Sequence, residues 1–192
     1  VYPADTSMRT RDQLVVTGTL AGERMHFIVN HWPSRLGGEK NSRPKREAAA
    51  ALTKHLADSL IQADPDSKVV IMGDLNDDPN NSSTSKVLGA KKKQNEVKPG
   101  GYFNTMWPIF AKGIGSLAYQ GQWNLFDQII ISSNLLGKDR STLKFIKAEV
   151  FNRDFLKQEE GKYKGYPKRT HAGGVYLNGY SDHFPTMIYL AK

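Results

Sequence analysis

Side chains that can bind a metal ion or transfer a proton stand at the ends of apolar runs in this sequence. Because side chains at strand ends can converge over one rim of a sheet, they are candidates for a single site. Carboxylate and amide oxygens suit a hard cation such as Mg²⁺, and imidazoles can hydrogen-bond phosphate oxygens or move protons. Together they suit a divalent cation and a bound phosphate. The residues are His31, Asp74, Asn76, Asp127, Asp182 and His183.

Each residue also has a structural explanation. Residues 73–76 follow an apolar run and are, by spacing alone, typical of a turn. A single His at a strand end is more often structural than catalytic. Asp127 differs, because it lies between Phe126 and Ile129 in an apolar run, where an unpaired charge would be strongly unfavourable. Asp127 therefore requires a partner, and structural and functional pairing fit the pattern equally well.

Other catalytic arrangements find little support. Ser181, Asp182 and His183 are consecutive, so they cannot form a relay in which each side chain orients the next. The chain contains neither a GxxxxGK[ST] nor a GxGxxG phosphate-binding loop. The absence of Cys excludes a disulfide framework, a Cys-zinc site and a Cys nucleophile.

The elements that must position these residues begin with a predicted hairpin and crossover. Two β-rich runs, 13–20 and 24–31, are joined by Ala21-Gly22-Glu23, which is a hairpin signal. A helical apolar pattern covers 43–62, and the short apolar run 68–72 predicts a buried strand. Residues 24–73 therefore predict a strand–helix–strand crossover with both strands in one sheet.

Local signals predict where the remaining elements begin and end. Ser42 is the expected N-cap of the helix, and Pro44 suits its first turn. An aromatic packed loop is expected at 102–110, one strand at 122–132 and a final strand at 183–190. No repeat or composition break divides the chain, which favours one α/β domain over residues 1–192.

Four motifs together resemble the endonuclease/exonuclease/phosphatase superfamily. That superfamily includes pancreatic-type deoxyribonucleases, abasic-site endonucleases, neutral sphingomyelinases and inositol polyphosphate phosphatases. Each motif alone is weak, but four in the same order make the match specific, and the resemblance extends from about Arg9 to Leu190. The motifs are NHWPSR at 30–35, GDLND at 73–77, FDQIIIS at 126–132 and SDHFP at 181–185.

The resemblance implies a two-sheet, four-layer α/β sandwich with its active site at the rim where the sheets meet. By motif, His31 and Asn76 would contact the scissile phosphate, and Asp74 would orient or deprotonate the attacking water. Asp127 would orient His183, the second catalytic histidine. Phosphoester hydrolysis needs such a set, because it requires an aimed water, neutralised phosphoryl oxygens and help for the leaving oxygen.

The same resemblance implies a cofactor and substrate contacts. Asp182, with Asp74, would bind Mg²⁺ (or Mn²⁺ or Ca²⁺). The implied activity is metal-dependent phosphoester hydrolysis, first as a nuclease or phosphodiesterase. A phosphatase acting on a phosphorylated lipid or small molecule, and a non-catalytic binding or assembly module, are the alternatives. The expected substrate-contacting positions are Asn30, Ser34, Arg35 and Trp123.

Charge favours a polyanionic substrate such as nucleic acid. Lysine and arginine number 27 against 19 acidic residues, which gives a formal net charge of +8, and basic residues gather at 91–93 and 157–169. Five aromatic residues could stack on bases, although packing is the plainer role for them: Trp32, Tyr102, Trp107, Tyr119 and Trp123. A merely soluble basic surface fits the charge alone equally well.

The family pattern starts earlier than this sequence. It includes an upstream Asn-bearing strand and a metal-binding Glu, which Glu23, Glu39 and Glu47 do not match. We therefore expect about 100 residues or more to be missing upstream, and this C-terminal part to be inactive alone. An uncovered sheet face predicts a dimer, a swapped arrangement or an apolar patch. Localisation stays open, and export with the signal segment missing is one alternative, since Val1 follows no such segment.

Overall fold

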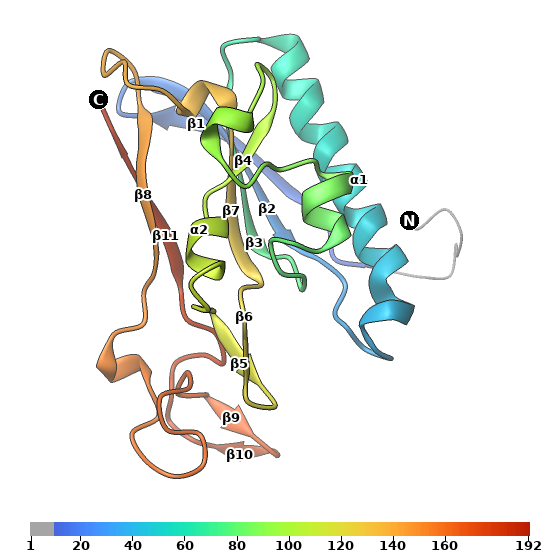
Figure 1. Ribbon diagram of the computed structural model, residues 1–192, viewed down its shortest axis with the longest axis vertical. Coiled ribbons are helices and arrows are strands. Elements are labelled where there is room, and N and C mark those ends of the chain that lie inside the picture. The colour runs from blue at the N-terminus through green and yellow to red at the C-terminus, as the bar shows by residue number, and fades with distance from the viewer. Residues whose placement is uncertain (1–9) are drawn as a thin grey trace.

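The computed structural model describes residues 10–192, so residues 1–9 of the predicted domain lie outside the described part. Its centre is a five-stranded mixed sheet with the strand order β1-β2-β3-β7-β4 (Figure 1). Strands β2 and β3 are parallel, and the other neighbouring pairs are antiparallel. The strands are β1 (Leu14–Leu20), β2 (Glu23–His31), β3 (Lys68–Asp74), β7 (Asp127–Ser132) and β4 (Tyr102–Asn104).

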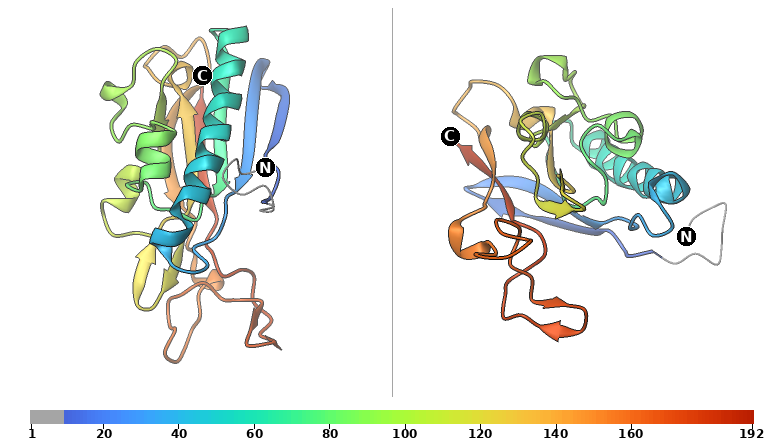
Figure 2. Two further views of the ribbon diagram at one scale, coloured as in Figure 1. Left: turned by 90° about the vertical axis from the view of Figure 1, so that its right-hand side faces the viewer. Right: turned by 60° about the horizontal axis from the view of Figure 1, so that its bottom comes forward.

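The predicted hairpin and crossover are confirmed. Strand β1 pairs over its whole length with residues 23–29 of β2, around a turn in which Ala21 and Gly22 both have positive φ angles. Helix α1 (Glu39–Ala63) then crosses one face of the sheet and returns the chain to β3 (Figure 2). Apolar residues of α1, β2 and β3 form the core on this face. Strands β2 and β3 can contribute to it because they carry apolar side chains on both faces of the sheet.

Helix α1 begins earlier than the sequence predicts. The N-cap is Gly38, and the predicted cap Ser42 lies inside the helix, where its hydroxyl donates to the Gly38 carbonyl and accepts from Arg46. Pro44 is also inside the helix rather than in its first turn. The buried partners of Ser42 and Arg46 therefore outweigh the local capping signal.

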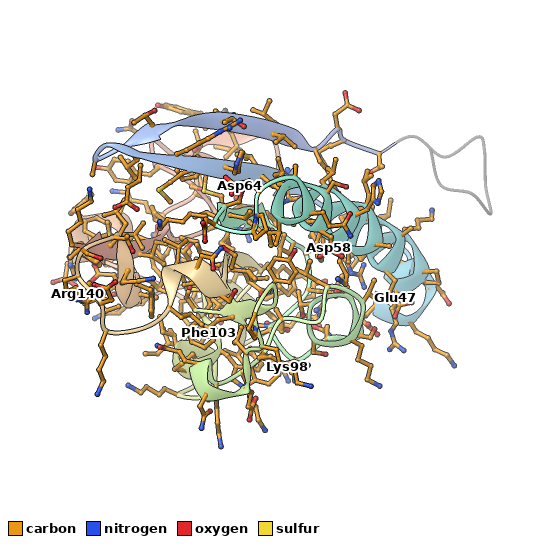
Figure 3. All side chains as sticks on the ribbon, turned by 90° about the horizontal axis from the view of Figure 1, so that it is seen from above. Glu47, Asp58, Asp64, Lys98, Phe103 and Arg140 are labelled. Atoms are coloured by element: carbon orange, nitrogen blue, oxygen red, sulfur yellow. The ribbon has the colours of Figure 1, made fainter. Side chains whose placement is uncertain are left out.

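A second sheet packs against the opposite face of the first. Strands β8 (Lys144–Val150) and β11 (Thr186–Ala191) pair in antiparallel fashion and enclose an apolar core against β2, β3 and β7 (Figure 2). Phe103 of β4 lies in this core and meets Phe145 edge to face at 5.8 Å, within the dense side-chain packing of Figure 3. The predicted two-sheet α/β architecture is therefore present.

Three predicted elements differ from those observed. The run 102–110 is not a loop, because it forms β4 and the short helix α2 (Trp107–Phe110). The run 122–132 divides into β6 (Gln122–Asn124) and β7, since Leu125 and Phe126 turn inward and the Leu125 N–H donates to Asp78. His183 precedes β11 rather than beginning it.

The remaining elements are short. Strand β5 pairs with β6, and β9 pairs with β10, both at the lower end of Figure 1. No helix within residues 10–192 is long and apolar enough to cross a membrane. The short elements are β5 (Leu117–Tyr119), β9 (His171–Ala172), β10 (Val175–Tyr176) and the single turns η1 (Ser83–Val87), η2 (Gln94–Glu96), η3 (Ser133–Leu135) and η4 (Asp154–Leu156).

Of the three consequences expected from an uncovered sheet face, the structure shows exposed apolar side chains. Strand β1 is exposed along its whole length, and Leu14 and Leu20 are 59% and 46% exposed. Nothing in residues 10–192 supports the predicted dimer or a swapped arrangement. Edge strand β1 is thus the least covered part of the large sheet.

Gly73 permits the close approach of β2 and β3 beside the candidate site. Its φ is +132°, and a Cβ there would overlap the Asn30 carbonyl. We expect Gly73→Ala to lower the free energy of unfolding by about 2 kcal/mol or more, because backbone strain and overpacking add. Urea unfolding measures this loss. The matched control is Gly18→Ala on β1, where a Cβ meets nothing within 4 Å, so equal stability losses in both variants would contradict the explanation.

Candidate active site

The register of the large sheet places three predicted site residues in one row. His31 of β2 is the register partner of Asp74 at the end of β3, and Asp74 is in turn the partner of Asp127 at the start of β7. Residues directly opposite each other on neighbouring strands project on the same face of a sheet. Side chains that are 43 and 53 positions apart in the chain therefore become neighbours.

Asp74 lies at the centre of this row. Its Oδ2 is 3.4 Å from Nε2 of His31, and its Oδ1 accepts a hydrogen bond of 2.9 Å from the Asn76 N–H. The carboxylate side chain is 19% exposed, whereas the His31 side chain is 46% exposed. The His31 ring is therefore more accessible to solvent than the Asp74 carboxylate.

Burial raises the pKa of the Asp74 carboxyl above its ordinary value. The charge of Asp127 contributes to this rise, and the Asn76 N–H opposes it. The nearby imidazoles of His183 and His31 also lower the pKa, but by less than burial raises it. Asp74 is therefore a stronger base than an exposed aspartate, as an acceptor of a proton from water requires.

Asp127 finds the partner that the sequence required. Its Oδ2 lies 2.8 Å from Nδ1 of His183, and the Ser116 hydroxyl donates to the same oxygen at 2.5 Å. Asp127 is the first residue of β7 and its side chain is 21% exposed, so it is half-buried rather than enclosed. The carboxylate holds the imidazole from its Nδ1 side and leaves Nε2 for a ligand.

The pKa of His183 is raised above its ordinary value, because the effects that raise it outweigh the effect of burial. Burial alone would lower the pKa of this imidazole. The hydrogen bond and charge of Asp127 outweigh burial, and the charges of Asp74 and Asp182 add to the rise. The imidazolium form is therefore stabilised at this position, which favours donation of a proton to a leaving oxygen.

Ser116 is a site residue that sequence reasoning missed. It is fully buried, its hydroxyl holds Asp127, and its carbonyl accepts a 2.7 Å hydrogen bond from the Phe184 N–H. These contacts join the β5 segment to the residue after His183. No local signal marks this serine, because its function depends on two segments that are distant in the sequence.

Asn76 occupies a left-handed backbone conformation in the loop after β3. Its φ is +51°, and its side-chain amide donates to the Trp32 carbonyl at 2.9 Å. Asparagine tolerates this region better than most residues, because its short polar side chain can bond locally. The Trp32 N–H donates to the Asp74 carbonyl at 2.9 Å, so the loops after β2 and β3 support each other.

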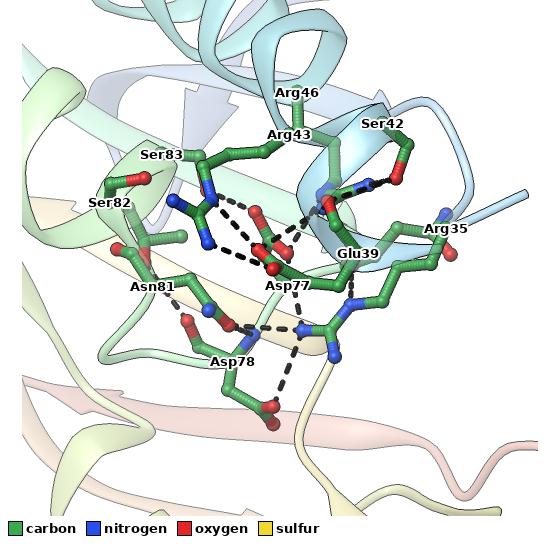
Figure 4. A network of polar contacts seen from close by, with 12 residues as sticks. Arg35, Glu39, Ser42, Arg43, Arg46, Asp77, Asp78, Asn81, Ser82 and Ser83 are labelled. Carbon is green, nitrogen blue, oxygen red and sulfur yellow. Dashed lines mark hydrogen bonds and ion pairs between the residues drawn. The ribbon is translucent and has the colours of Figure 1, made fainter. Parts of the chain in front are cut away.

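An ion-pair network anchors the same loop (Figure 4). Asp77 is fully buried, and its Oδ1 lies 2.8 Å from Nε of the fully buried Arg46 on α1. Arg35 approaches the same oxygen at 3.2 Å, and the Ser83 hydroxyl donates to the other oxygen at 2.7 Å. A second carboxylate, that of Asp78, accepts from the Leu125 N–H. Two aspartates of the loop therefore serve as anchors of its backbone.

The four predicted substrate-contacting positions have different surroundings. Asn30 is 4% exposed, and its amide bonds inside the protein to Ile28, Trp32 and Thr53. Ser34 is exposed, whereas Arg35 is engaged with the loop after β3. The Trp123 ring is partly exposed and stacks on Phe184 with ring centroids 6.0 Å apart. Ser34 and Trp123 are thus the positions of the four that face solvent.

The described residues do not fit a complete metal site. Asp182 is exposed, and Asp74 already accepts from Asn76 and faces His31. No group of three or more potential ligands (His, Cys, Asp or Glu) with metal-binding geometry occurs within residues 10–192. A Mg²⁺ site needs several oxygen ligands in near-octahedral geometry, so these two carboxylates are insufficient by themselves.

Comparison with solved structures finds a similar fold in several proteins. D. rerio TDP2, in a structure complexed with single strand DNA product, matches with a TM-score of 0.57 and 15% identity, over 100% of this chain and 65% of that one. A Bacteroides thetaiotaomicron mannosyl-6-phosphatase matches with a TM-score of 0.51 and 15% identity, over 90% of this chain and 53% of that one. The similarity at these identities concerns the fold.

A Staphylococcus aureus beta toxin variant with bound magnesium ions also matches, with a TM-score of 0.51 and 19% identity over 91% of this chain and 56% of that one. The chain spans 53% to 65% of the length of these three structures. No curated protein matches the chain. A family model described as Endonuclease/Exonuclease/phosphatase family matches residues 1–192. The predicted resemblance is confirmed, and the chain belongs to the endonuclease/exonuclease/phosphatase family.

Proposed function

We propose that this chain carries proton-transfer and phosphate-contacting groups of a phosphoester hydrolase that acts on phosphodiesters. The observation that carries the proposal is the row formed by His31, Asp74 and Asp127, with His183 hydrogen-bonded to its end. The carboxylate of Asp74, whose pKa is raised, lies at the centre of that row, and the stabilised imidazolium of His183 lies at its end. Hydrolysis by an attacking water uses a base for the water and an acid for the leaving oxygen.

Each group has a role that its surroundings support. Asp74, with its raised pKa, would accept a proton from the attacking water. His183, held by Asp127, would neutralise a phosphoryl oxygen or protonate the leaving oxygen through its free Nε2. The exposed His31 ring would contact the phosphate from the opposite end of the row.

Nucleic acid is the substrate class that we favour. The net charge of +8 attracts a polyanion, and the partly exposed Trp123 ring, which packs against Phe184 and Tyr166, could contact a base. The similar TDP2 structure is a complex with single strand DNA product. A phosphatase acting on a phosphorylated lipid or small molecule is the second candidate, which the similar mannosyl-6-phosphatase favours.

Removal of the acid or the base should abolish most hydrolysis. In the longest active form of the protein, we expect His183→Ala and Asp74→Asn each to lower turnover of bis-p-nitrophenyl phosphate by about 10²–10⁴-fold. The controls His55→Ala and Asp66→Asn alter exposed residues on α1 and in a turn. Undiminished turnover in either site variant would overturn the assignment. Faster turnover of p-nitrophenyl phosphate than of bis-p-nitrophenyl phosphate would favour the phosphatase. Substrate binding without turnover in any form of the protein would favour a binding module.

The raised pKa of His183 should depend on Asp127. An NMR titration of the His183 ring should give a lower pKa in Asp127→Asn, because burial is then opposed by weaker interactions. Since the folded pKa is raised, the charge-dependent stability of the pair is fully present below the unfolded pKa of about 6.5. It is lost as the pH rises through the folded pKa. Asp139→Asn is the control, and an equal shift in that variant would contradict the pairing.

The 192-residue chain by itself should bind Mg²⁺ only weakly and hydrolyse little substrate, because Asp74 and Asp182 form an incomplete ligand set. Isothermal titration calorimetry with MgCl₂ should therefore detect at most millimolar binding. Asp182→Asn should reduce that binding further, while Asp66→Asn should not. Tight binding that survives Asp182→Asn would show that other residues hold the metal.

A further inference from the structure

Arg35 belongs to one of the four site motifs, and its guanidinium contacts two of the others. It extends from the loop after β2, and its Nε donates to the Asn76 carbonyl at 2.9 Å. Its Nη2 lies 3.2 Å from Asp77 Oδ1 and 3.0 Å from Asn81 Oδ1 (Figure 4). The guanidinium also stacks over the Phe126 ring, with Cζ 4.4 Å from the ring centroid. One side chain thus joins the segments of His31, of Asp74 and of Asp127.

We propose that Arg35 is a positioning residue that sets the geometry of Asn76 and of the first residues of β7, an inference that rests on the proposed function. A guanidinium is planar and presents fixed donors, so it can bond the Asn76 carbonyl and Asp77 in one plane while its face covers an aromatic ring. A lysine ammonium has no such fork. The geometry of the group, rather than its charge alone, carries the proposed role.

Asn76 requires such support because its backbone lies in a sparsely populated region. The residue is held at φ +51° by contacts from three sides: the Asp74 carboxylate on its N–H, the Trp32 carbonyl on its side chain and Arg35 on its carbonyl. A strained conformation persists only where its surroundings over-determine it. Loss of the Arg35 contact would free the peptide that follows Asn76 and, through the shared hydrogen bond, alter Asp74.

The contact with Phe126 extends this effect to the other half of the site. Phe126 directly precedes Asp127, and its carbonyl accepts a 2.8 Å hydrogen bond from the Leu75 N–H. The ring is 8% exposed and covered by the guanidinium. Arg35 therefore braces the point where the loop after β3 meets the start of β7, between Asp74 and Asp127.

The role of Arg35 is separable from that of Arg46. Arg46 and Asp77 are both fully buried, so removal of Arg46 would leave a buried charge poorly compensated and destabilise the protein. Arg35 is 27% exposed at its side chain, and Asp77 keeps Arg46 when Arg35 is lost. Substitution of Arg35 should therefore disturb the site while the fold remains.

The first test uses the 192-residue chain and no activity. In Arg35→Met and in Arg35→Lys, NMR should show a shifted Asn76 side-chain amide and faster hydrogen exchange of the Asn76 N–H, with amides of β3 unchanged. Arg43→Met is the matched control, because Arg43 is exposed and, among residues 10–192, pairs with Glu39. If Asn76 is unaffected in Arg35→Met, the positioning role is wrong. If Arg35→Met does not fold, Arg35→Lys decides by the same readout.

The second test uses the longest active form. We expect Arg35→Met and Arg35→Lys to lower kcat about 10²-fold with little change in KM, because misplaced groups slow the chemical step. A raised KM with unchanged kcat would assign Arg35 to substrate contact and overturn the proposal, as would full activity in Arg35→Lys. An absence of hydrolysis in every form would refute the proposed function, while the NMR test would still decide the positioning role.

Discussion

The buried carboxylate of Asp77 is the constraint on which the site geometry depends. A charge with no exposed surface requires close partners, and Asp77 has Arg46, Arg35 and the Ser83 hydroxyl. The Asp77 carbonyl also accepts from Gln128 of β7. Because these partners come from separate segments, together they restrict the loop after β3. The same loop contains Asn76, whose N–H donates to the Asp74 carboxylate.

The sheet register and the anchored loop act together. Register alone brings His31, Asp74 and Asp127 into a row, but it would not orient the Asp74 carboxylate. The turn at Asn76 supplies the hydrogen bond that does so. The last site residue, His183, lies in the segment just before strand β11 and is hydrogen-bonded to Asp127. The site is thus assembled from both sheets.

The electrostatics of the site separate the roles of its two central groups. Burial raises the pKa of Asp74, which makes it a stronger base than an exposed aspartate. Burial alone would lower the pKa of His183, but the hydrogen bond and charge of Asp127 raise it. Environments that give neighbouring groups different proton affinities are characteristic of acid–base sites. The half-exposed position of His31 leaves the row open to a ligand. In the proposed function, a phosphate would lie over the row, in contact with His31 and His183.

Local sequence determined the hairpin, the crossover from β2 to β3 and the need of Asp127 for a partner, because turn residues, apolar periodicity and a charge among apolar neighbours act over a few positions. The four motifs also determined the family. The resemblance also implied that Asp127 orients His183. Only the tertiary structure decided that Ser116 is a further partner of Asp127, that Arg35 joins the loops, and that Ser42 lies inside α1. Those outcomes depend on contacts between segments far apart in the chain. Pairing of buried polar groups across such distances is set by packing, which local preferences do not encode.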